Sequence, residues 1–476
     1  MSVSSAEDAR TPGRAEDAPS TGRAEDPRTT TYWAQYAWLP HANGPVVEQD
    51  VLISTGSGGR IARVQPDSGP CPPGAVRLEG LLLPGQANAH SHAFHRALRG
   101  HVQVGSGTFW TWRDTMYRFA GALDPDRYLA LATAVYAEMA LAGITAVGEF
   151  HYLHHAPGGA RYDDPNAMGE ALIEAAARAG IRITLLDTCY LSAGFGAEPT
   201  RPQLRFSDGD AEAWAVRADA LRPREHARIG AAIHSVRAVP AEQLGTVAHW
   251  AARREAPLHV HLSEQTAEND ACLAAHGVTP TRLLADHGAL GPRTSVVHAT
   301  HLTEEDVELL TGSSTTVCMC PTTERDLADG IGPARQLASG GSPITLGSDS
   351  HAVIDPFEEA RALELDERLR TRTRGHWTAN ALLRAGTEDG HASLGWPEAG
   401  RIEAGSLADF TVIALDSVRT AGPAPRLGAE IAVFAAAAAD VRHVVVGGRH
   451  VVKDGVHTLV PDVPGALRSS IAALGR

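Results

Sequence analysis

Four histidines and one aspartate stand at the ends of short apolar segments that are far apart along the chain. They are His90, His92, His261, His298 and Asp349. Residues two apart on a β-strand point to the same side, so the His-Ser-His sequence at 90–92 can present two imidazoles to one ion. Imidazole nitrogens and a carboxylate, with one position left for water, make up the ligand set of a catalytic zinc ion. The sequence therefore predicts a catalytic metal centre.

Four of these side chains are predicted to be the metal ligands: His90, His92, His261 and Asp349. We prefer His261 to His259 because a glutamate follows His261 three residues later, where its carboxylate can reach the bound water without being a ligand. His259 then belongs to the strand, and its role as an alternate ligand stays open. Zinc, with one ion per chain, is the expected metal, and iron or manganese are the alternatives.

The remaining polar groups predict a hydrolytic reaction. Zinc lowers the pKa of its water towards neutrality, which yields hydroxide at an electrophilic carbon. Asp349 and His298 can accept the water proton, and Glu264 can carry it to a departing nitrogen. These residues therefore predict hydrolysis at a carbon–nitrogen centre, either amide cleavage or deamination.

Eight apolar strand segments alternate with amphipathic helices rich in Ala and Leu between residues 84 and 399. The segments are LLLPGQANAH, GITAVGEFHY, RITLLDTCY, ARIGAAIHSVRA, PLHVHLSEQ, TSVVHATHL, TTVCMCP and PITLGSDSH. Eight βα units predict an α/β fold, a (β/α)8 TIM-like barrel with its catalytic groups at the C-terminal strand ends. A doubly wound open sheet is the alternative, but no G-x-G-x-x-G sequence follows a strand.

Both ends of the chain outside this region have a different sequence pattern, in which short segments of alternating apolar and polar residues are separated by turns containing Gly, Pro and Asn. Residues 31–83 and 400–462 are predicted to pair into one small β-sandwich domain, with a hairpin around Gly447 and Gly448. Residues 463–476 are expected to form a C-terminal segment. Residues 1–30 contain almost no large apolar side chain, so we expect a disordered tail there.

Composition restricts the partners and the location of the protein. A formal charge of −14 disfavours binding to nucleic acid or to an anionic membrane through bulk electrostatics. The most apolar run, at 431–441, is half the length of about 20 residues that a bilayer requires, and we find no secretory signal. Five scattered cysteines fit a reducing compartment. We therefore expect a cytoplasmic protein that binds neither nucleic acid nor membrane.

These motifs resemble those of the amidohydrolase superfamily across most of residues 32–460. Two-metal members carry a bridging lysine at the end of the fourth strand, whereas RIGAAIHSVR contains none, which is similar to the one-metal deaminase branch. Five segments together resemble the formimidoylglutamate deiminases: PGQANAHSHAFHRALRG, TFWTWRDTMYRF, EFHYLHH, HSVRAV and GSDSH. The Trp-rich second segment is the most specific of the five.

The resemblance implies hydrolysis of N-formimino-L-glutamate to N-formyl-L-glutamate and ammonia, a step of histidine degradation. It assigns substrate binding to Arg113, Tyr152, His234 and Arg237. Guanidinium groups suit the two carboxylates of such a small dicarboxylate substrate. His95 is a further substrate-binding candidate, although the family's SHAFQR pattern has Gln at this place, which leaves the substrate fit near it open. Because dimers are common in the superfamily, the resemblance also suggests a homodimer.

Two other functions are left open. A zinc deaminase or chlorohydrolase of an aminated heterocycle would use the same ligands, but its substrate would not require two arginines near the metal. A metal-free, amidohydrolase-like scaffold that binds partners would lack some ligands, whereas all five positions are filled here. Activity on formiminoglutamate against heterocycles separates the first alternative from our prediction, and a metal assay tests the second.

Overall fold

The computed structural model describes residues 30–104 and 109–475, with the side chains of residues 109–111 outside the description. The predicted disordered tail therefore lies outside the described residues, apart from its last residue, Thr30. The described chain forms two eight-stranded sheets, each with its own set of strands. One sheet comes from the middle of the chain and the other from both of its ends.

The central sheet is parallel and closes into a barrel. Its strands follow chain order, and each one is hydrogen-bonded to the next. A parallel bridge between Ser91 and Asp349 joins the last segment back to the first. The strands are β5 (Gln86–Ser91), β6 (Ile144–His151), β7 (Arg182–Cys189), β8 (Ala227–Ile233), β9 (Leu258–Leu262), β10 (Thr294–His298), β11 (Thr316–Met319) and β12 (Ile344–Leu346). The predicted (β/α)8 barrel is confirmed, and each predicted strand segment matches one of these strands.

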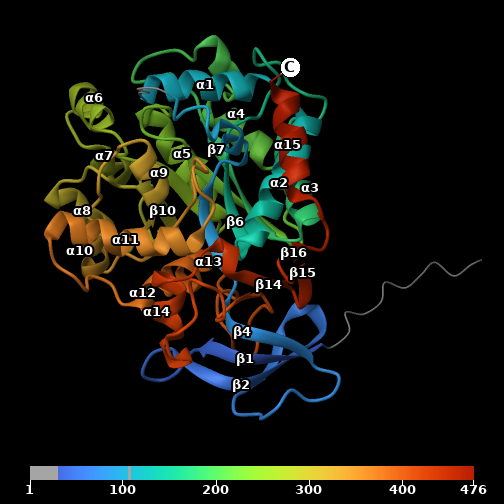
Figure 1. Cartoon of the computed structure of the whole chain (residues 1–476). Helices are drawn as coiled ribbons and strands as arrows, with labels where there is room; N and C mark the ends of the chain where they lie inside the picture. The colour runs from blue at the N-terminus through green and yellow to red at the C-terminus, as the bar shows by residue number, and fades with distance from the viewer. Residues whose placement is uncertain (1–29, 105–108, 476) are drawn as a thin grey trace, which may run out of the picture.

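Helices surround this barrel (Figure 1). Several begin with an acidic cap followed by proline, as at Asp124, whose carboxylate accepts from the Arg127 amide at 2.9 Å. The helices are α1 (Phe109–Gly121), α2 (Pro125–Leu141), α3 (Ala167–Ala179), α4 (Ala211–Ala218), α5 (Ala241–Arg253), α6 (Thr266–His276), α7 (Pro280–Asp286), α8 (Glu304–Gly312), α9 (Pro321–Asp326), α10 (Ala334–Gly340), α11 (Pro356–Thr371), α12 (Ala379–Gly386), α13 (Glu388–Ser393), α14 (Gly428–Phe434) and α15 (Val463–Leu474).

The second sheet joins the two chain ends. Strand β4 lies between β1, to which it runs parallel, and β13, to which it runs antiparallel. Gly447 and Gly448, with φ of 57° and 74°, form the tight turn of the predicted hairpin between β14 and β15. The strands are β1 (Thr31–Leu39), β2 (Val46–Thr55), β3 (Ile61–Gln65), β4 (Val76–Pro84), β13 (Phe410–Ile413), β14 (Val441–Val446), β15 (Arg449–Lys453) and β16 (Val456–His457). A separate β unit built from both chain ends is therefore confirmed.

This second sheet packs at the N-terminal end of the barrel. Arg182, the first residue of β7, forms a two-point ion pair with Asp409 beside β13, at 2.6 and 3.0 Å. The Thr411 hydroxyl donates to the Gly143 carbonyl, just before β6, at 2.8 Å. The C-terminal strand ends consequently open on the opposite side, where α1 lies (Figure 1). Helix α15, from the predicted C-terminal segment, packs along α2.

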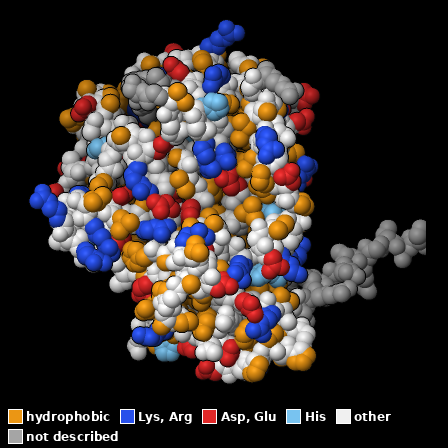
Figure 2. Space-filling model, in the orientation of Figure 1, with side chains coloured by type: hydrophobic (Ala, Val, Ile, Leu, Met, Phe, Trp, Pro, Cys, Tyr) orange, Lys and Arg blue, Asp and Glu red, His pale blue; other side chains and the backbone are white. Residues whose placement is uncertain are grey.

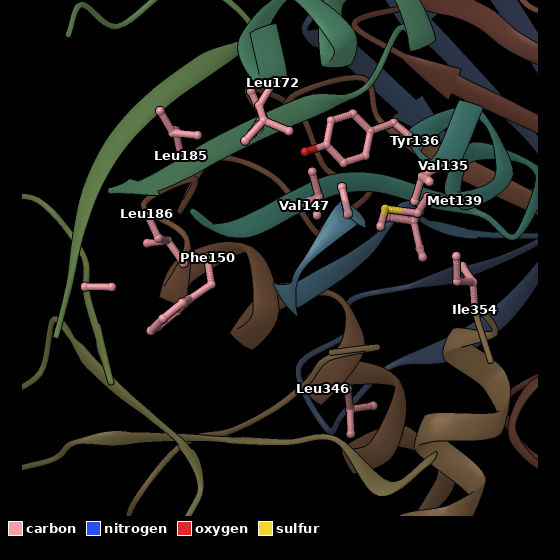
Figure 3. Packing of buried hydrophobic residues seen from close by; sticks show 14 of the residues in the cluster. Val135, Tyr136, Met139, Val147, Phe150, Leu172, Leu185, Leu186, Leu346 and Ile354 are labelled. Carbon is pink, nitrogen blue, oxygen red and sulfur yellow. The ribbon is translucent and has the colours of Figure 1, made fainter. Parts of the chain in front are cut away.

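The barrel and its helices share one continuous hydrophobic core. Val135, Tyr136 and Met139 of α2 pack with Val147 of β6 and Leu172 of α3 (Figure 3). Tight packing of these fully buried side chains holds the strands in register. Phe150, nearer the C-terminal end of β6, carries this core up to the histidines, because its ring centroid lies 5.0 Å from that of His90.

The surface mixes both signs of charge. On the face shown in Figure 2, basic and acidic side chains are interspersed over barrel and terminal sheet. In the described part of the chain, the helices are all too short or too polar to cross a bilayer. All five cysteines are described and none is in a disulfide.

Candidate metal centre and active site

The four predicted ligands meet at the C-terminal mouth of the barrel. His90 lies in β5 and His92 directly follows it, His261 comes from β9, and Asp349 comes from the turn after β12. Their ligand atoms all lie within 4.8 Å of one another. The Asp349 Oδ1 atom is 3.3 Å from Nε2 of both His90 and His92, and the Nε2 atoms of His90 and His261 are 3.0 Å apart. The barrel thus gathers residues from distant parts of the sequence into one buried cluster.

The hydrogen bonds around this cluster fit a cation at its centre. The Nδ1 atom of His92 donates to the Phe150 carbonyl at 3.0 Å, and that of His261 donates to the His234 carbonyl at 2.9 Å. Their Nε2 atoms therefore turn lone pairs inward, towards the carboxylate oxygens of Asp349. Converging acceptors repel one another unless a cation lies between them, and outer bonds of this kind hold histidine ligands in place. The described residues consequently fit one divalent metal ion with an N3O ligand set.

Electrostatics also favours this state. Burial lowers the pKa of His90 to about 3, and it lowers the pKa of His92 and His261, so all three imidazoles are neutral, the form that binds metals. Burial alone would raise the pKa of Asp349, but its hydrogen bond with His90 and the neighbouring imidazoles hold that pKa well below the usual value. The cluster therefore keeps an ionised carboxylate beside neutral imidazoles.

Backbone strain concentrates at these strand ends. Positive φ angles occur at Ser263 (49°), His298 (70°) and Asp349 (38°), a region that non-glycine residues rarely adopt. Gly347, two residues before Asp349, leaves room for the close approach of this turn to β5. A Cβ atom at Gly347 would lie 2.8 Å from the Cβ of His90. A glycine is therefore needed in the GSDSH sequence for Asp349 to reach the histidines.

The predicted proton-transfer groups lie beside the ligands. His298 Nε2 is 3.9 Å from Asp349 and 4.0 Å from Glu264, and its Nδ1 faces Glu324 at 3.3 Å. Burial alone would lower the pKa of His298, but these three carboxylates raise it well above the usual value. Burial raises the pKa of Glu264, which suits a group that must both accept and return a proton. Three candidate proton carriers thus share one side of the cluster.

A cavity opens directly above the cluster. It is lined by Asp349, His261, His298 and Glu264, and also by four of the predicted substrate-binding residues: Arg113, Tyr152, His234 and Arg237. His95 is buried behind this wall and is not one of the described lining residues. Its Nε2 atom lies 3.0 Å from the Tyr152 hydroxyl. The structure thus brings four of the five predicted substrate residues into the cavity wall, whereas His95 packs against His92, with their ring centroids 4.5 Å apart, outside the lining.

Sequence reasoning missed several residues that complete the site. Met116, Tyr117, Tyr190, Phe206 and Leu327 also line the cavity. Tyr190 directly follows β7, so it carried the same strand-end signal as the predicted residues. The others lie on helices or in loops and carried no such signal. From the Trp-rich segment TFWTWRDTMYRF, Trp112 lines the cavity, and the Trp110 side chain lies outside the described residues.

A second cluster of potential ligands lies nearby but is already satisfied. His151, His154 and Asp187 also place their ligand atoms within 4.8 Å of one another. Both oxygens of Asp187 accept from Arg217, at 2.8 and 2.9 Å, and one also accepts from Trp214 at 2.8 Å. A guanidinium already occupies the place of a cation, so this cluster is a buried ion-pair network and does not fit a metal site.

Comparison with known proteins agrees with the site geometry. A model of the amidohydrolase family matches residues 81–451. This chain belongs to the amidohydrolase family. Formimidoylglutamate deiminase from Pseudomonas aeruginosa is 37% identical over 423 residues, which cover 86% of this chain and 92% of that protein. The predicted resemblance to the formimidoylglutamate deiminases is confirmed.

Two further relatives extend this result. The 8-oxoguanine deaminase of Pseudomonas aeruginosa is 31% identical over 422 residues, covering 88% of this chain and 91% of that protein. The crystal structure of an amidohydrolase from Brucella melitensis superposes with a TM-score of 0.86 at 32% identity, covering 94% of this chain and all of that one. Membership of this family and deaminating relatives support hydrolysis of carbon–nitrogen bonds at a metal-binding site.

Proposed function

We propose that this chain hydrolyses N-formimino-L-glutamate to N-formyl-L-glutamate and ammonia, with one zinc ion held by His90, His92, His261 and Asp349. One observation carries this proposal: two arginines, Arg113 and Arg237, line the same cavity as the predicted ligands. Guanidinium groups match carboxylates geometrically, and the substrate carries two of them. The likeness to the deiminase of Pseudomonas aeruginosa supports the same substrate.

The chain's own residues account for each proton that the reaction moves. A divalent cation held by His90, His92, His261 and Asp349 would lower the pKa of a water molecule at the cluster. The water oxygen bonds to the formimino carbon while Asp349 and His298, which face one another at 3.9 Å, accept the released proton. Glu264, 4.0 Å from His298, passes this proton to the imino nitrogen, which becomes an amino group on a tetrahedral carbon. The second proton of the former water then follows the same route to that nitrogen, the carbonyl forms as the carbon–nitrogen bond breaks, and ammonia leaves.

The rest of the cavity holds the glutamate part of the substrate. Arg113 and Arg237 bind its carboxylates, and Tyr152 and His234 contact the chain between them and the formimino group. The ring centroids of Tyr152 and His234 are 5.4 Å apart, so both reach the same part of the cavity. His95 acts through Tyr152, whose hydroxyl it contacts. The presence of His95, where the family's SHAFQR pattern has Gln, therefore changes the group that positions the Tyr152 hydroxyl.

A second candidate function is deamination of an aminated heterocycle. The aromatic rings of Trp112, Tyr117, Tyr152, Tyr190 and Phe206 line the cavity and offer faces on which a purine could stack. The likeness to an 8-oxoguanine deaminase supports this alternative. The two arginines favour the dicarboxylate, because its two carboxylates are anionic and a neutral heterocycle offers them no anionic group.

Ammonia release from a panel of substrates tests the proposal. The zinc-loaded protein should release ammonia from N-formimino-L-glutamate with a kcat/KM at least about 100-fold higher than from 8-oxoguanine or adenosine, because neither heterocycle supplies a carboxylate. Glu264→Gln should retain zinc but lose most activity, and Arg237→Ala should chiefly raise KM at unchanged metal content. Preference for a heterocycle would contradict the proposal, and loss of zinc from Glu264→Gln would make Glu264 a ligand.

A further inference from the structure

Arg237 is held from behind by a buried carboxylate. Its Nε atom donates to Oε2 of Glu268 at 2.7 Å. The Glu268 side chain is only 3% exposed, whereas that of Arg237 is 27% exposed and lines the cavity. The arginine is thus clamped through its Nε edge.

The other oxygen of Glu268 is anchored to the catalytic turn. Its Oε1 atom accepts from the Ser263 amide at 3.0 Å. Ser263 has a positive φ of 49° and directly precedes Glu264. Glu268 stands in the first turn of α6, where a carboxylate is favourable at the helix N-terminus, but its side chain is buried against these two donors. One carboxylate therefore joins the predicted substrate-binding arginine to the turn that carries the predicted proton shuttle.

The orientation of a guanidinium decides how well it binds a carboxylate. An arginine presents two parallel N–H bonds to a carboxylate only when its plane is fixed, and an unfixed side chain loses rotamer entropy on binding. Glu268 supplies that fixing through its hydrogen bond to Nε, and its carboxylate raises the pKa of Arg237 against the effect of burial.

We propose that Glu268 is a positioning residue: it orients the Arg237 guanidinium so that two of its N–H groups can bind a carboxylate of the substrate. The inference rests on the proposed function, because it takes a dicarboxylate as the ligand of the cavity. It predicts that Glu268 acts on carboxylate binding through Arg237 and has little separate effect.

Calorimetric titration of the zinc-loaded protein with glutarate tests this role. Glu268→Gln should weaken glutarate binding by about 10- to 100-fold, the range of a charge-assisted hydrogen bond. In the Arg237→Ala background the same change should alter binding by less than about 2-fold, because the fork that Glu268 positions is absent. Equal losses in both backgrounds would mean a general structural role and would overturn the proposal.

Two further measurements make the result decisive. Glu304→Gln removes an exposed acid from the first turn of α8 and should leave binding unchanged. Arg237→Ala leaves Glu268 buried without its guanidinium, so adding Glu268→Gln should raise Tm. A fall in Tm would count against the proposal. Should Glu268→Gln fail to fold, Glu268→Asp keeps the charge and permits the same comparison.

The outcome is separable from that of the proposed function. If the Glu268 and Arg237 substitutions are coupled in glutarate binding but the protein does not turn over N-formimino-L-glutamate, the role of Glu268 stands and the proposed substrate is rejected. If the protein turns over N-formimino-L-glutamate but the two substitutions act independently on glutarate binding, the substrate stands and the role of Glu268 is rejected. A wild-type protein that does not bind glutarate at all would overturn the role of Glu268.

Discussion

Two clusters of histidine and aspartate lie in the same barrel, each with its ligand atoms within 4.8 Å of one another, yet only one of the two suits a metal ion. At the barrel mouth, His92 and His261 donate outward to backbone carbonyls, and their lone pairs converge on Asp349. In the second cluster, Asp187 is paired on both oxygens with Arg217. The difference lies in the partner of each carboxylate: Asp349 faces imidazoles, whereas Asp187 is paired with the Arg217 guanidinium.

The second cluster is built for stability. Arg217 also binds Asp208 at 2.9 to 3.0 Å, and His155 lies 3.0 Å from the same carboxylate. Burial, with the charge of Arg217, lowers the pKa of His154 to about 4, so this histidine stays neutral. A set of residue types within reach of one another is therefore insufficient for a metal site, because the charge of the neighbours decides what the set can hold.

The largest expected effect separates the two aspartates. Asp349→Asn should lose bound metal and reduce kcat by at least about 10³-fold, since it removes both the charged member of the proposed ligand set and a proposed proton acceptor. Asp187→Asn should retain the full metal content, because its partner is an arginine. Elemental analysis of metal content, together with ammonia release, checks both variants. If Asp187→Asn lost the metal and Asp349→Asn retained it, the second cluster would be the metal site.

The next effect concerns stability. Arg217→Met should lower the free energy of unfolding by about 3–5 kcal/mol, because it leaves two buried carboxylates without a counter-charge. Metal content should not change. Urea denaturation measures this loss, and Arg254→Met, which breaks the exposed pair with Asp219, should cost less than about 1 kcal/mol. Similar losses in both variants would contradict a special role for the buried network.

A smaller effect is expected at Glu324, behind His298. This carboxylate accepts from the Cys320 amide at 2.8 Å and faces His298 Nδ1 at 3.3 Å. Glu324→Gln should retain the metal but reduce kcat by about 10- to 100-fold, as for other groups that orient an active-site histidine. It should also lower the pKa of His298 and move the acidic limb of the kcat–pH profile to lower pH. An unchanged profile would remove His298 from the role of proton acceptor.

The smallest effect is the pH dependence of the second cluster. Burial would raise the pKa of Asp187 and Asp208. Arg217 nevertheless holds the pKa of Asp187 below the usual value of 3.8, and His155, with His154 and Arg217, does the same at Asp208. A lowered folded-state pKa stabilises the protein above the unfolded pKa, and this contribution is lost as the pH falls below about 4. The difference in unfolding free energy between wild type and Arg217→Met should therefore narrow below pH 4. A constant difference would mean that these carboxylates are not the groups affected.

The sequence predicted the fold and the convergence of the candidate ligands because both depend on periodic signals. Eight apolar segments, each ending in a polar residue, indicated the barrel, and catalytic groups in this architecture stand at the C-terminal strand ends. His90, His92, His261 and Asp349 carried that signal and come together in the structure. Glu268 and Glu324 carried none, since each lies on a helix whose orientation toward the barrel mouth no local pattern records.

Residue type and spacing alone determined that imidazoles and a carboxylate would converge, because alternation along a strand and closure of a parallel barrel leave few other arrangements. Only the tertiary structure decided which groups are neutralised by neighbours, as with Arg217 at Asp187, and which face a cavity, as with Tyr152 in front of His95. Charge compensation and exposure arise from contacts between segments tens to hundreds of residues apart. No short stretch of sequence encodes such contacts.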